Sequence, residues 1–191
     1  FVHGESQIEM LKSKLNWPEN KLLLIQSLRF RLDAKESLSK KIFIPYAIHH
    51  YDRFINEFKK LLINSPVNNF PKLEVKNHPA MLNSKKHLDL KRKLKKIMEI
   101  YKDRFSDSSP NKNTSIFIGV TSAVLEALER GINVIHICGD SVFQSYNEKI
   151  WLNLKAKQLS EFIFHYNLIL AGKYINFGKN NTLNQTLKTL F

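Results

Sequence analysis

One stretch of the sequence decides the fold class: residues 115–137 read SIFIGVTSAVLEALERGINVIHI. Its two ends, Ser115–Val120 and Asn133–Ile137, are short and continuous apolar runs. Continuous rather than alternating runs are typical of strands that are covered on both faces, as in parallel sheets. Between them we predict a turn with two hydroxyl residues and a helix over Ala123–Arg130, ended by a glycine. The stretch therefore predicts a strand–helix–strand unit of a parallel sheet.

The rest of the chain continues this alternation. Lys41–Ala47 is a second strand candidate, and Pro45 marks its end because proline cannot donate to a ladder. His49–Ile63 repeats apolar residues at helical spacing. We therefore predict an α/β fold: a Rossmann-like open parallel sheet with helices on both faces. The other expected elements are a short helix within residues 1–20 that ends at Trp17-Pro18, strands over 21–25 and 72–76, helices over 84–105 and 149–159, a segment 161–170 that fits either helix or strand, and a weak helix over 182–191.

The composition indicates one strongly basic domain with at most a short appendage. The 191 residues are 43% hydrophobic and carry 30 Lys+Arg against 17 Asp+Glu, a formal net charge of +13. Such a charge favours acidic partners: nucleic acid, an anionic membrane face or phosphorylated small molecules. The single cysteine, Cys138, excludes a disulfide within the chain and favours a reducing compartment. No apolar run approaches the roughly 18 residues of a membrane span.

The turn after the Ser115–Val120 strand is the first candidate site. Gly119 allows a ligand to approach the backbone closely, and Thr121 and Ser122 offer hydroxyls at the start of a helix, where free N–H groups suit a phosphate. The plainer interpretation is an ordinary helix cap, which the motif alone favours. Glu126 in the same helix either reaches a ribose hydroxyl or complements the helix dipole, and spacing alone favours neither.

A second candidate is His78-Pro79, at the carboxyl end of the predicted strand 72–76. A histidine there, stiffened by the proline and accompanied by Lys76, can donate to a phosphate or a leaving-group oxygen. The plainer interpretation is a surface histidine in a turn. Ligands of open parallel sheets bind beyond the carboxyl ends of the strands, so the loop after Ile44, the 77–79 loop and the 120–122 turn are expected together.

Other basic and histidine-rich stretches favour structural roles. The lysine run of residues 85–96 would suit nucleic acid or an anionic bilayer, but the solvated face of an amphipathic helix is the favoured interpretation. His49-His50 is a poor ligand pair because adjacent helical side chains point about 100° apart, and His136 in an apolar strand suggests a core histidine. No HExxH, paired cysteines, GxxxxGK[ST] or GxGxxG is present, so no metal is predicted, and P-loop and ordinary dinucleotide-binding functions are disfavoured.

Four segments in one order and spacing carry a family resemblance: KIFIPYAIHHYDRFINEFKKLL (41–62), LEVKNHP (73–79), the 115–137 stretch and NEKIW (147–151). Together they resemble the C-terminal, nucleotide-sugar-binding half of a GT-B glycosyltransferase. The likeness is to bacterial surface-carbohydrate enzymes of capsule and lipopolysaccharide synthesis, including sialyl- and Kdo-type transferases with an HP motif and a Ser-rich motif. It covers about Lys41–Trp151, with Thr-Ser here where the sialyltransferases have Ser-Ser.

The resemblance implies roles for particular residues. His78 would be the catalytic histidine of the HP motif, set against the donor phosphate. Thr121 and Ser122 would be the hydroxyl pair at the phosphate-binding helix, and Glu126 would lie near the nucleotide ribose or base. A helix start and a donor side chain can neutralise the departing phosphate without a metal. Pro45 and Tyr46 would line the first loop of this half. The substrate-binding set that we expect is therefore Pro45, Tyr46, Lys76, Pro79, Gly119, Thr121, Ser122 and Glu126.

The resemblance also implies a half-enzyme. GT-B enzymes have two Rossmann-like domains with the active site between them, and the general base usually comes from the N-terminal one. Residues 1–40 would then be a hinge and the start of the C-terminal half, and residues 41–191 the nucleotide-sugar-binding domain with a helical tail. The implied partners are a nucleotide-sugar, a glycan or lipid-linked acceptor and the N-terminal domain, with no cofactor, metal or nucleic acid. The implied location is cytoplasmic, with peripheral contact at the inner membrane.

Two other classes stay open at this point. A non-hydrolysing sugar-nucleotide epimerase shares the two-domain architecture, but it needs carboxylates to move protons, and no convincing pair is visible. A non-catalytic basic binding module would rest on the net charge alone, and its binding to nucleic acid would collapse as the salt concentration rises.

Overall fold

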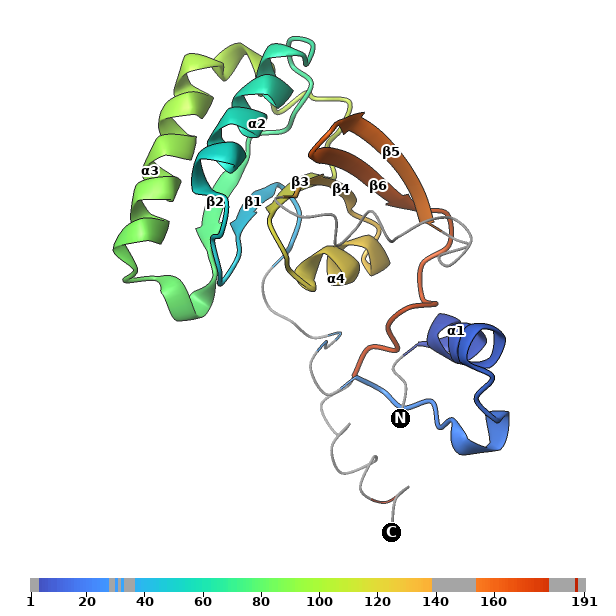
Figure 1. Cartoon of the computed structure of the whole chain (residues 1–191). Coiled ribbons are helices and arrows are strands. Elements are labelled where there is room, and N and C mark those ends of the chain that lie inside the picture. Colours follow the sequence, from blue (N-terminus) through green and yellow to red (C-terminus); the bar gives the residue numbers. More distant parts are fainter. Residues whose placement is uncertain are drawn as a thin grey trace.

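The computed structural model describes residues 4–27, 30, 32, 37–138, 154–178 and 188, and its centre is a six-stranded sheet (Figure 1). Three 3₁₀ turns, Glu19–Lys21, Pro79–Met81 and Lys102–Arg104, join some of the elements. The strands are β1 (Lys41–Ile44), β2 (Glu74–Asn77), β3 (Thr114–Ile118), β4 (Asn133–Ile137), β5 (Leu154–Ser160) and β6 (Ile163–Leu168), and the α-helices are α1 (Glu5–Leu15), α2 (Tyr51–Ile63), α3 (Lys85–Ile100) and α4 (Ala123–Glu129).

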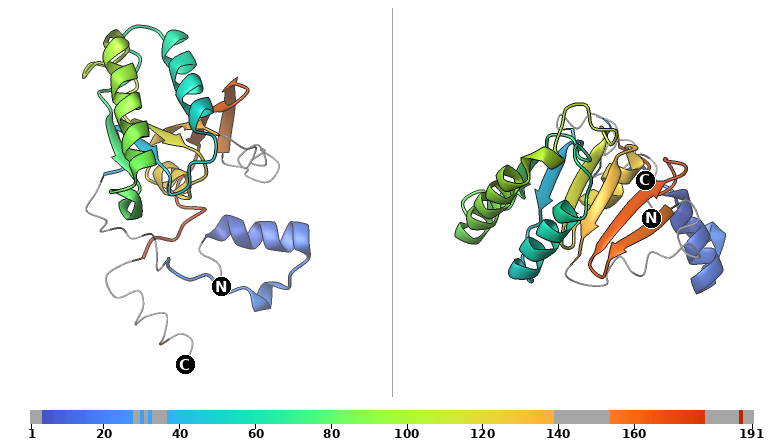
Figure 2. Two further views of the ribbon diagram at one scale, coloured as in Figure 1. Left: turned by 60° about the vertical axis from the view of Figure 1, so that its left-hand side comes forward. Right: turned by 90° about the horizontal axis from the view of Figure 1, so that it is seen from above.

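The sheet has the strand order β2-β1-β3-β4-β6-β5. The first four strands are parallel, whereas β6 runs antiparallel to β4 and β5 runs antiparallel to β6. Figure 2 shows the twisted sheet from above, with the β5–β6 hairpin at one side. The prediction of a Rossmann-like open α/β sheet is confirmed. An antiparallel hairpin, β5–β6, extends the parallel part of the sheet beyond β4.

Helices cover both faces of the sheet because side chains of the strands alternate between two cores. Ile42 and Ile44 face the core that contains α2 and α3. Phe43 and Phe117 face the core of α4, where their rings stack with centroids 4.7 Å apart. Each large apolar side chain buried in this way stabilises the fold by about 1.5–3 kcal/mol.

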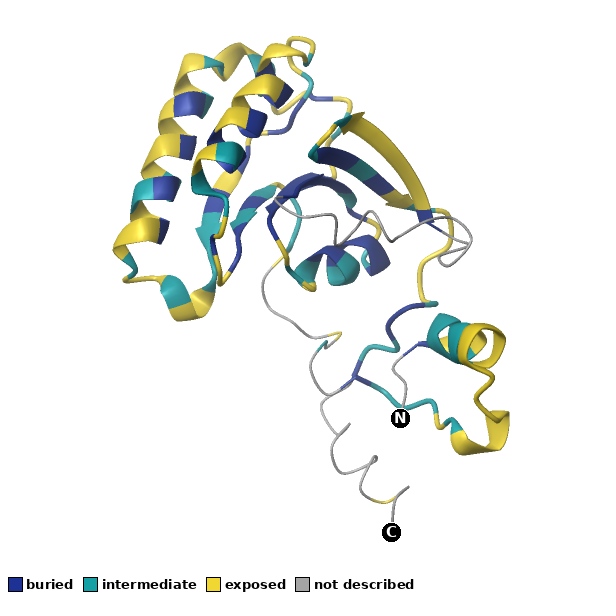
Figure 3. Cartoon of the chain, viewed as in Figure 1, coloured by how far each residue is buried: buried dark blue, intermediate teal, exposed yellow. Residues whose placement is uncertain are grey.

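The periodicity of the sequence explains how α2 and α3 lie on the sheet. Phe54, Phe58 and Leu61 recur every three or four residues along α2 and are buried. On α3, His87, Leu90, Leu94 and Ile97 form the corresponding buried stripe, while the outer side is exposed (Figure 3).

The strand order creates a switch point between β1 and β3. The chain leaves β1 through α2 toward β2, and it leaves β3 through α4 toward β4, on the other side of β1. Because α2 and α4 lie on opposite faces, the two loops separate at the carboxyl ends of these neighbouring strands. Such a point is where open α/β sheets bind ligands.

Four local predictions need correction or completion. The helix predicted over 149–159 is wrong for its described part, because Leu154 begins strand β5; residues 149–153 lie outside the described residues. The strand predicted over 21–25 is also wrong: Lys21 ends a 3₁₀ turn and Leu24 forms only a bridge, in a segment that lies outside the sheet. The ambiguous 161–170 segment forms strand β6. Of the weak helix predicted over 182–191, only Lys188 is described.

The N-terminal segment is joined to the C-terminal part of the chain. The backbone N–H and the hydroxyl of Ser6 both donate to the carbonyl of Lys173, at 3.0 and 2.8 Å. The N–H of Ser27 donates to the carbonyl of Asn176 at 2.6 Å. Segments almost 170 residues apart in sequence therefore lie side by side, as Figure 1 shows near the N-terminal label.

One buried carboxylate fixes this C-terminal segment on α4. Glu129 accepts hydrogen bonds from the N–H groups of Gly172, of Tyr174 at 2.5 Å and of Ile175 at 3.3 Å. Three backbone donors thus compensate the burial of one charge. Within the described residues, no helix has the length and apolar character needed to cross a bilayer.

Candidate functional site

Three loops meet at the carboxyl edge of the parallel strands. Ile44 at the end of β1 lies opposite Asn77 at the end of β2, and the N–H of His78 donates to the carbonyl of Ile44 at 3.0 Å. The turn after β3 joins them through Gly119, which lies against Pro45 of the first loop. The structure therefore brings together the three loops that the strand-end rule selects from the sequence.

His78 is held in one orientation by two contacts. Its Nδ1 accepts a hydrogen bond from the N–H of Ala80 at 3.2 Å, which makes His78 the N-cap of the 3₁₀ turn that starts at Pro79. Its ring also meets the ring of Tyr46 edge to face, with centroids 5.5 Å apart. Because Nδ1 accepts in the neutral ring, the proton lies on Nε2, which is the donor left for a ligand.

Gly119 is required by both conformation and space. Its φ of +65° is in the left-handed region, and a Cβ at this position would lie 3.1 Å from Pro45 Cγ and 3.2 Å from Phe54 Cζ. Its carbonyl accepts a hydrogen bond from Nε2 of His136 at 2.7 Å. The backbone of this turn is thus fixed from both sides, and packing on Pro45 and Phe54 explains the glycine; the ligand approach predicted at Gly119 stays a prediction.

Thr121 and Ser122 have different local roles. The hydroxyl of Thr121 accepts from the N–H of Ala123 at 3.3 Å, so it caps the first turn of α4. Ser122 occupies the N-cap position without a side-chain cap bond and is exposed. The predicted cap is therefore Thr121, and the exposed Ser122 does not use its hydroxyl to cap the helix.

Two predicted site residues are engaged in ion pairs. Nε and NH2 of Arg130, one turn further along α4, donate to the carboxylate of Glu126 at 3.1 and 2.9 Å. This pair directs Glu126 along the helix, away from the carboxyl edge, and favours its structural interpretation. Lys76 lies opposite Phe43, on the α4 side of the sheet, and pairs with Glu74 at 3.3 Å.

The structure adds two residues of α3 that sequence reasoning missed. Nε2 of buried His87 donates to the carbonyl of Pro45 at 2.9 Å, and its Nδ1 lies 2.9 Å from the hydroxyl of Ser84. Nζ of Lys86 donates to the carbonyl of Ile48 at 2.6 Å. Both bonds attach the first turn of α3 to the loop after β1. The signal in the sequence is His87 at the start of the apolar stripe of α3.

His136 is fully buried below the site, as expected of a core histidine. Burial lowers its pKa from 6.5 to about 4, and the hydrogen bond to the Gly119 carbonyl opposes this only in part. The imidazole is therefore neutral at physiological pH and serves as a donor that holds the Gly119 carbonyl.

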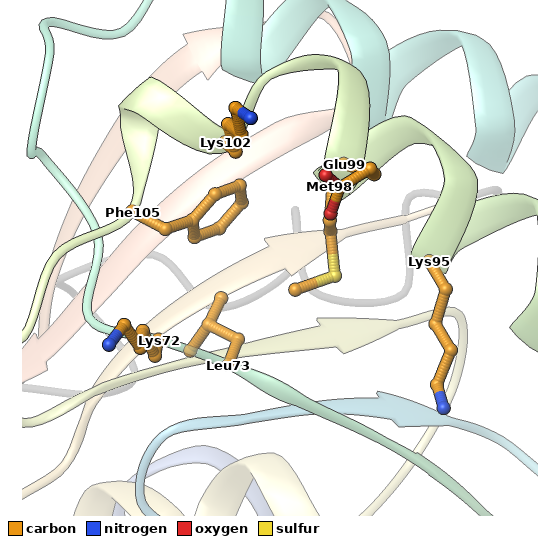
Figure 4. Close-up of a pocket in the computed structure, with 7 residues that line it drawn as sticks. All are labelled: Lys72, Leu73, Lys95, Met98, Glu99, Lys102 and Phe105. Carbon is orange, nitrogen blue, oxygen red and sulfur yellow. The ribbon is translucent and has the colours of Figure 1, made fainter.

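Two cavities lie on the α2–α3 side rather than at the carboxyl edge. One, of about 400 Å³, is lined by the two residues just before β2, by the end of α3 and by the segment that follows α3 (Figure 4). The other, of about 440 Å³, lies between the end of α2 and the β5–β6 hairpin. Among the described residues, no group of three or more His, Cys, Asp or Glu is placed to hold a metal ion.

The fold and this edge define an open α/β protein with a topological switch point between β1 and β3. Comparisons with protein-family models, with curated proteins and with solved structures found no match for the chain. Function therefore has to be argued from the site itself.

Proposed function

We propose that this chain is the donor-binding half of a GT-B-type glycosyltransferase that moves a sugar from a nucleotide-sugar to a surface glycan. The observation that carries the proposal is the contact among the three strand-end loops at the β1–β3 switch point. Tyr46 packs on His78, and Pro45 packs on Gly119, so residues from three loops share one edge.

The chemistry proposed for this edge is stabilisation of a leaving phosphate. The bond from the sugar to the phosphate oxygen breaks, its electron pair stays on the nucleotide, and the acceptor oxygen takes its place on the sugar. Nε2–H of His78 and the hydroxyl of Ser122 are the donors assigned to the growing phosphate charge. The acceptor proton passes to a base that the resemblance places in the other half of such enzymes.

A nucleotide titration tests the proposal. The 191-residue chain is melted in the presence of CMP, UDP, GDP or ADP at moderate salt concentration. A nucleotide at about one hundred times its dissociation constant stabilises the folded state by roughly 2.7 kcal/mol. We expect one nucleotide to stabilise the chain selectively. No shift with any of the four at millimolar concentration would contradict a donor-binding site.

Two variants locate the binding at the carboxyl edge. In His78→Asn the side-chain oxygen can still accept from the N–H of Ala80 and cap the turn, but the Nε2 donor is lost. We expect the nucleotide shift to disappear in His78→Asn and to weaken in Ser122→Ala. The matched controls are His165→Asn on β6 and Ser13→Ala on α1, which lie outside the three strand-end loops and should keep the full shift. An unchanged shift in His78→Asn would remove the histidine from the site.

A further inference from the structure

The outer side of α3 is the most basic surface element of the described chain. This 16-residue helix carries seven lysine and arginine residues and two acidic ones. Its net charge of +5 is a large share of the chain's +13. The helix is about 24 Å long. We define the α3 basic face as the side chains that recur at three- to four-residue spacing on its exposed side: Lys85, Leu88, Arg92, Lys95 and Lys96.

Most of this charge is not neutralised within the protein. Asp89 accepts from Arg92 at 2.5 Å and lies 3.4 Å from Lys93, so one carboxylate serves two cations. Among the described residues, Lys85, Lys95 and Lys96 have no ion-pair partner. The α3 basic face therefore presents three lysines without an ion-pair partner beside the paired Arg92, and these attract a surface with a high density of negative charge.

Exposed aliphatic side chains accompany these cations. Leu82 just before α3, Leu88 in its second turn and Ile100 at its end are 59%, 48% and 64% exposed. Exposed leucine and isoleucine between lysines suit the boundary of headgroups and acyl chains. They have no role against a sugar–phosphate backbone, and α3 has no aromatic residue on which a base can stack.

The cavity at the C-terminal end of α3 repeats this combination. Its apolar walls are Leu73, Met98 and Phe105, which point toward one another in Figure 4. Three lysines and one carboxylate, that of Glu99, surround them, and Lys95 also belongs to the α3 basic face. An apolar hollow whose rim keeps a net positive charge fits an anionic amphiphile.

We propose that the α3 basic face, with this cavity, docks on a bilayer that contains anionic phospholipids. Docking does not depend on nucleotide binding at the carboxyl edge. It does place that edge near the membrane, because the first turn of α3 is bonded to the loop after β1 through His87 and Lys86.

Cosedimentation of the 191-residue chain with vesicles tests this surface. The vesicles are phosphatidylcholine alone or phosphatidylcholine with phosphatidylglycerol. The test variant is Lys95→Glu/Lys96→Glu. Its control, Lys155→Glu/Lys157→Glu, makes the same charge change on exposed residues of β5, at the other edge of the sheet. A basic side chain near the surface is worth about fivefold in affinity, so we expect the test variant to bind at least about thirtyfold more weakly and the control to bind nearly normally.

A second pair of variants distinguishes binding to a bilayer from binding to nucleic acid. Leu88→Ser/Ile100→Ser should weaken vesicle binding and leave any oligonucleotide binding unchanged, whereas Ile169→Ser/Leu170→Ser, equally exposed elsewhere, should change neither. Binding that requires phosphatidylglycerol, with these variant effects, supports the docking surface. It is overturned by absent vesicle binding at low salt, by equal losses in both charge variants, or by an oligonucleotide that outcompetes the vesicles at the same salt concentration.

Discussion

Acidification should destabilise the fold through His136. Its pKa is about 4 in the folded state, against 6.5 for an unperturbed imidazole. A group with a lowered folded pKa binds more protons when unfolded, so its contribution to stability is present above pH 6.5 and is lost as the pH falls toward 4. At about pH 5 the unfolded imidazole is largely charged and the folded one largely neutral. The free energy of unfolding should therefore drop by about 2 kcal/mol between about pH 7.5 and pH 5 on account of this residue.

The assay is urea denaturation of the wild type and of His136→Gln at both pH values. The glutamine amide can still donate to the Gly119 carbonyl but does not titrate in this range. Burial, and to a smaller extent the charge of Lys157, lower the pKa of His165 as well. This effect is the same in the wild type and in His136→Gln, so it cancels in the comparison. We expect the pH-dependent loss to be about 2 kcal/mol smaller in His136→Gln.

Equal losses in the two proteins would refute this reasoning. A direct measurement removes any dependence on the variant. The carbon-bound proton of the His136 ring should titrate by NMR with a midpoint near 4 in the folded protein, and a midpoint close to 6.5 would contradict the effect of burial.

Three further predictions concern single side chains. Gly119→Ala should lower the free energy of unfolding by about 1–2 kcal/mol, because alanine is strained at φ +65°; an unchanged urea midpoint would contradict this. Glu129→Gln should cost about 2 kcal/mol and speed amide exchange at Tyr174, since the backbone donors lose a charged acceptor; unchanged exchange would count against the anchor. Tyr51→Phe should raise the pKa of Asp89 from about 2 toward 3.8, because the Tyr51 hydroxyl is the main cause of its lowering; a carboxyl titration by NMR that stays near 2 would exclude that cause.

The parallel half of the sheet could be predicted because its signals are local. The continuous apolar run of Asn133–Ile137 coincides with β4 to the residue, and Pro45 stops β1 where expected. Strand β5 could not be predicted in this way. Its residues are mostly exposed, and its conformation depends on hydrogen-bonded pairing with β6, where Ala156 lies opposite Tyr166.

Positions at the site could be predicted, but contacts could not. Strand ends placed His78 and Gly119 at one edge, yet the bond from His87 to the Pro45 carbonyl joins residues 42 positions apart and leaves no local pattern. The role of Glu126 was open in the sequence. The structure decides it, because Glu126 forms an ion pair with Arg130, four residues further along the chain.

The joining of Ser6 to Lys173 and of Ser27 to Asn176 has a consequence for the timing of assembly during synthesis. The ribosome synthesises Ser6 and Ser27 well before their hydrogen-bond partners Lys173 and Asn176. Every strand of the sheet is complete before those partners emerge. We therefore expect α1 to wait undocked while the sheet folds, and to take its place only after Lys173 and Asn176 have been synthesised.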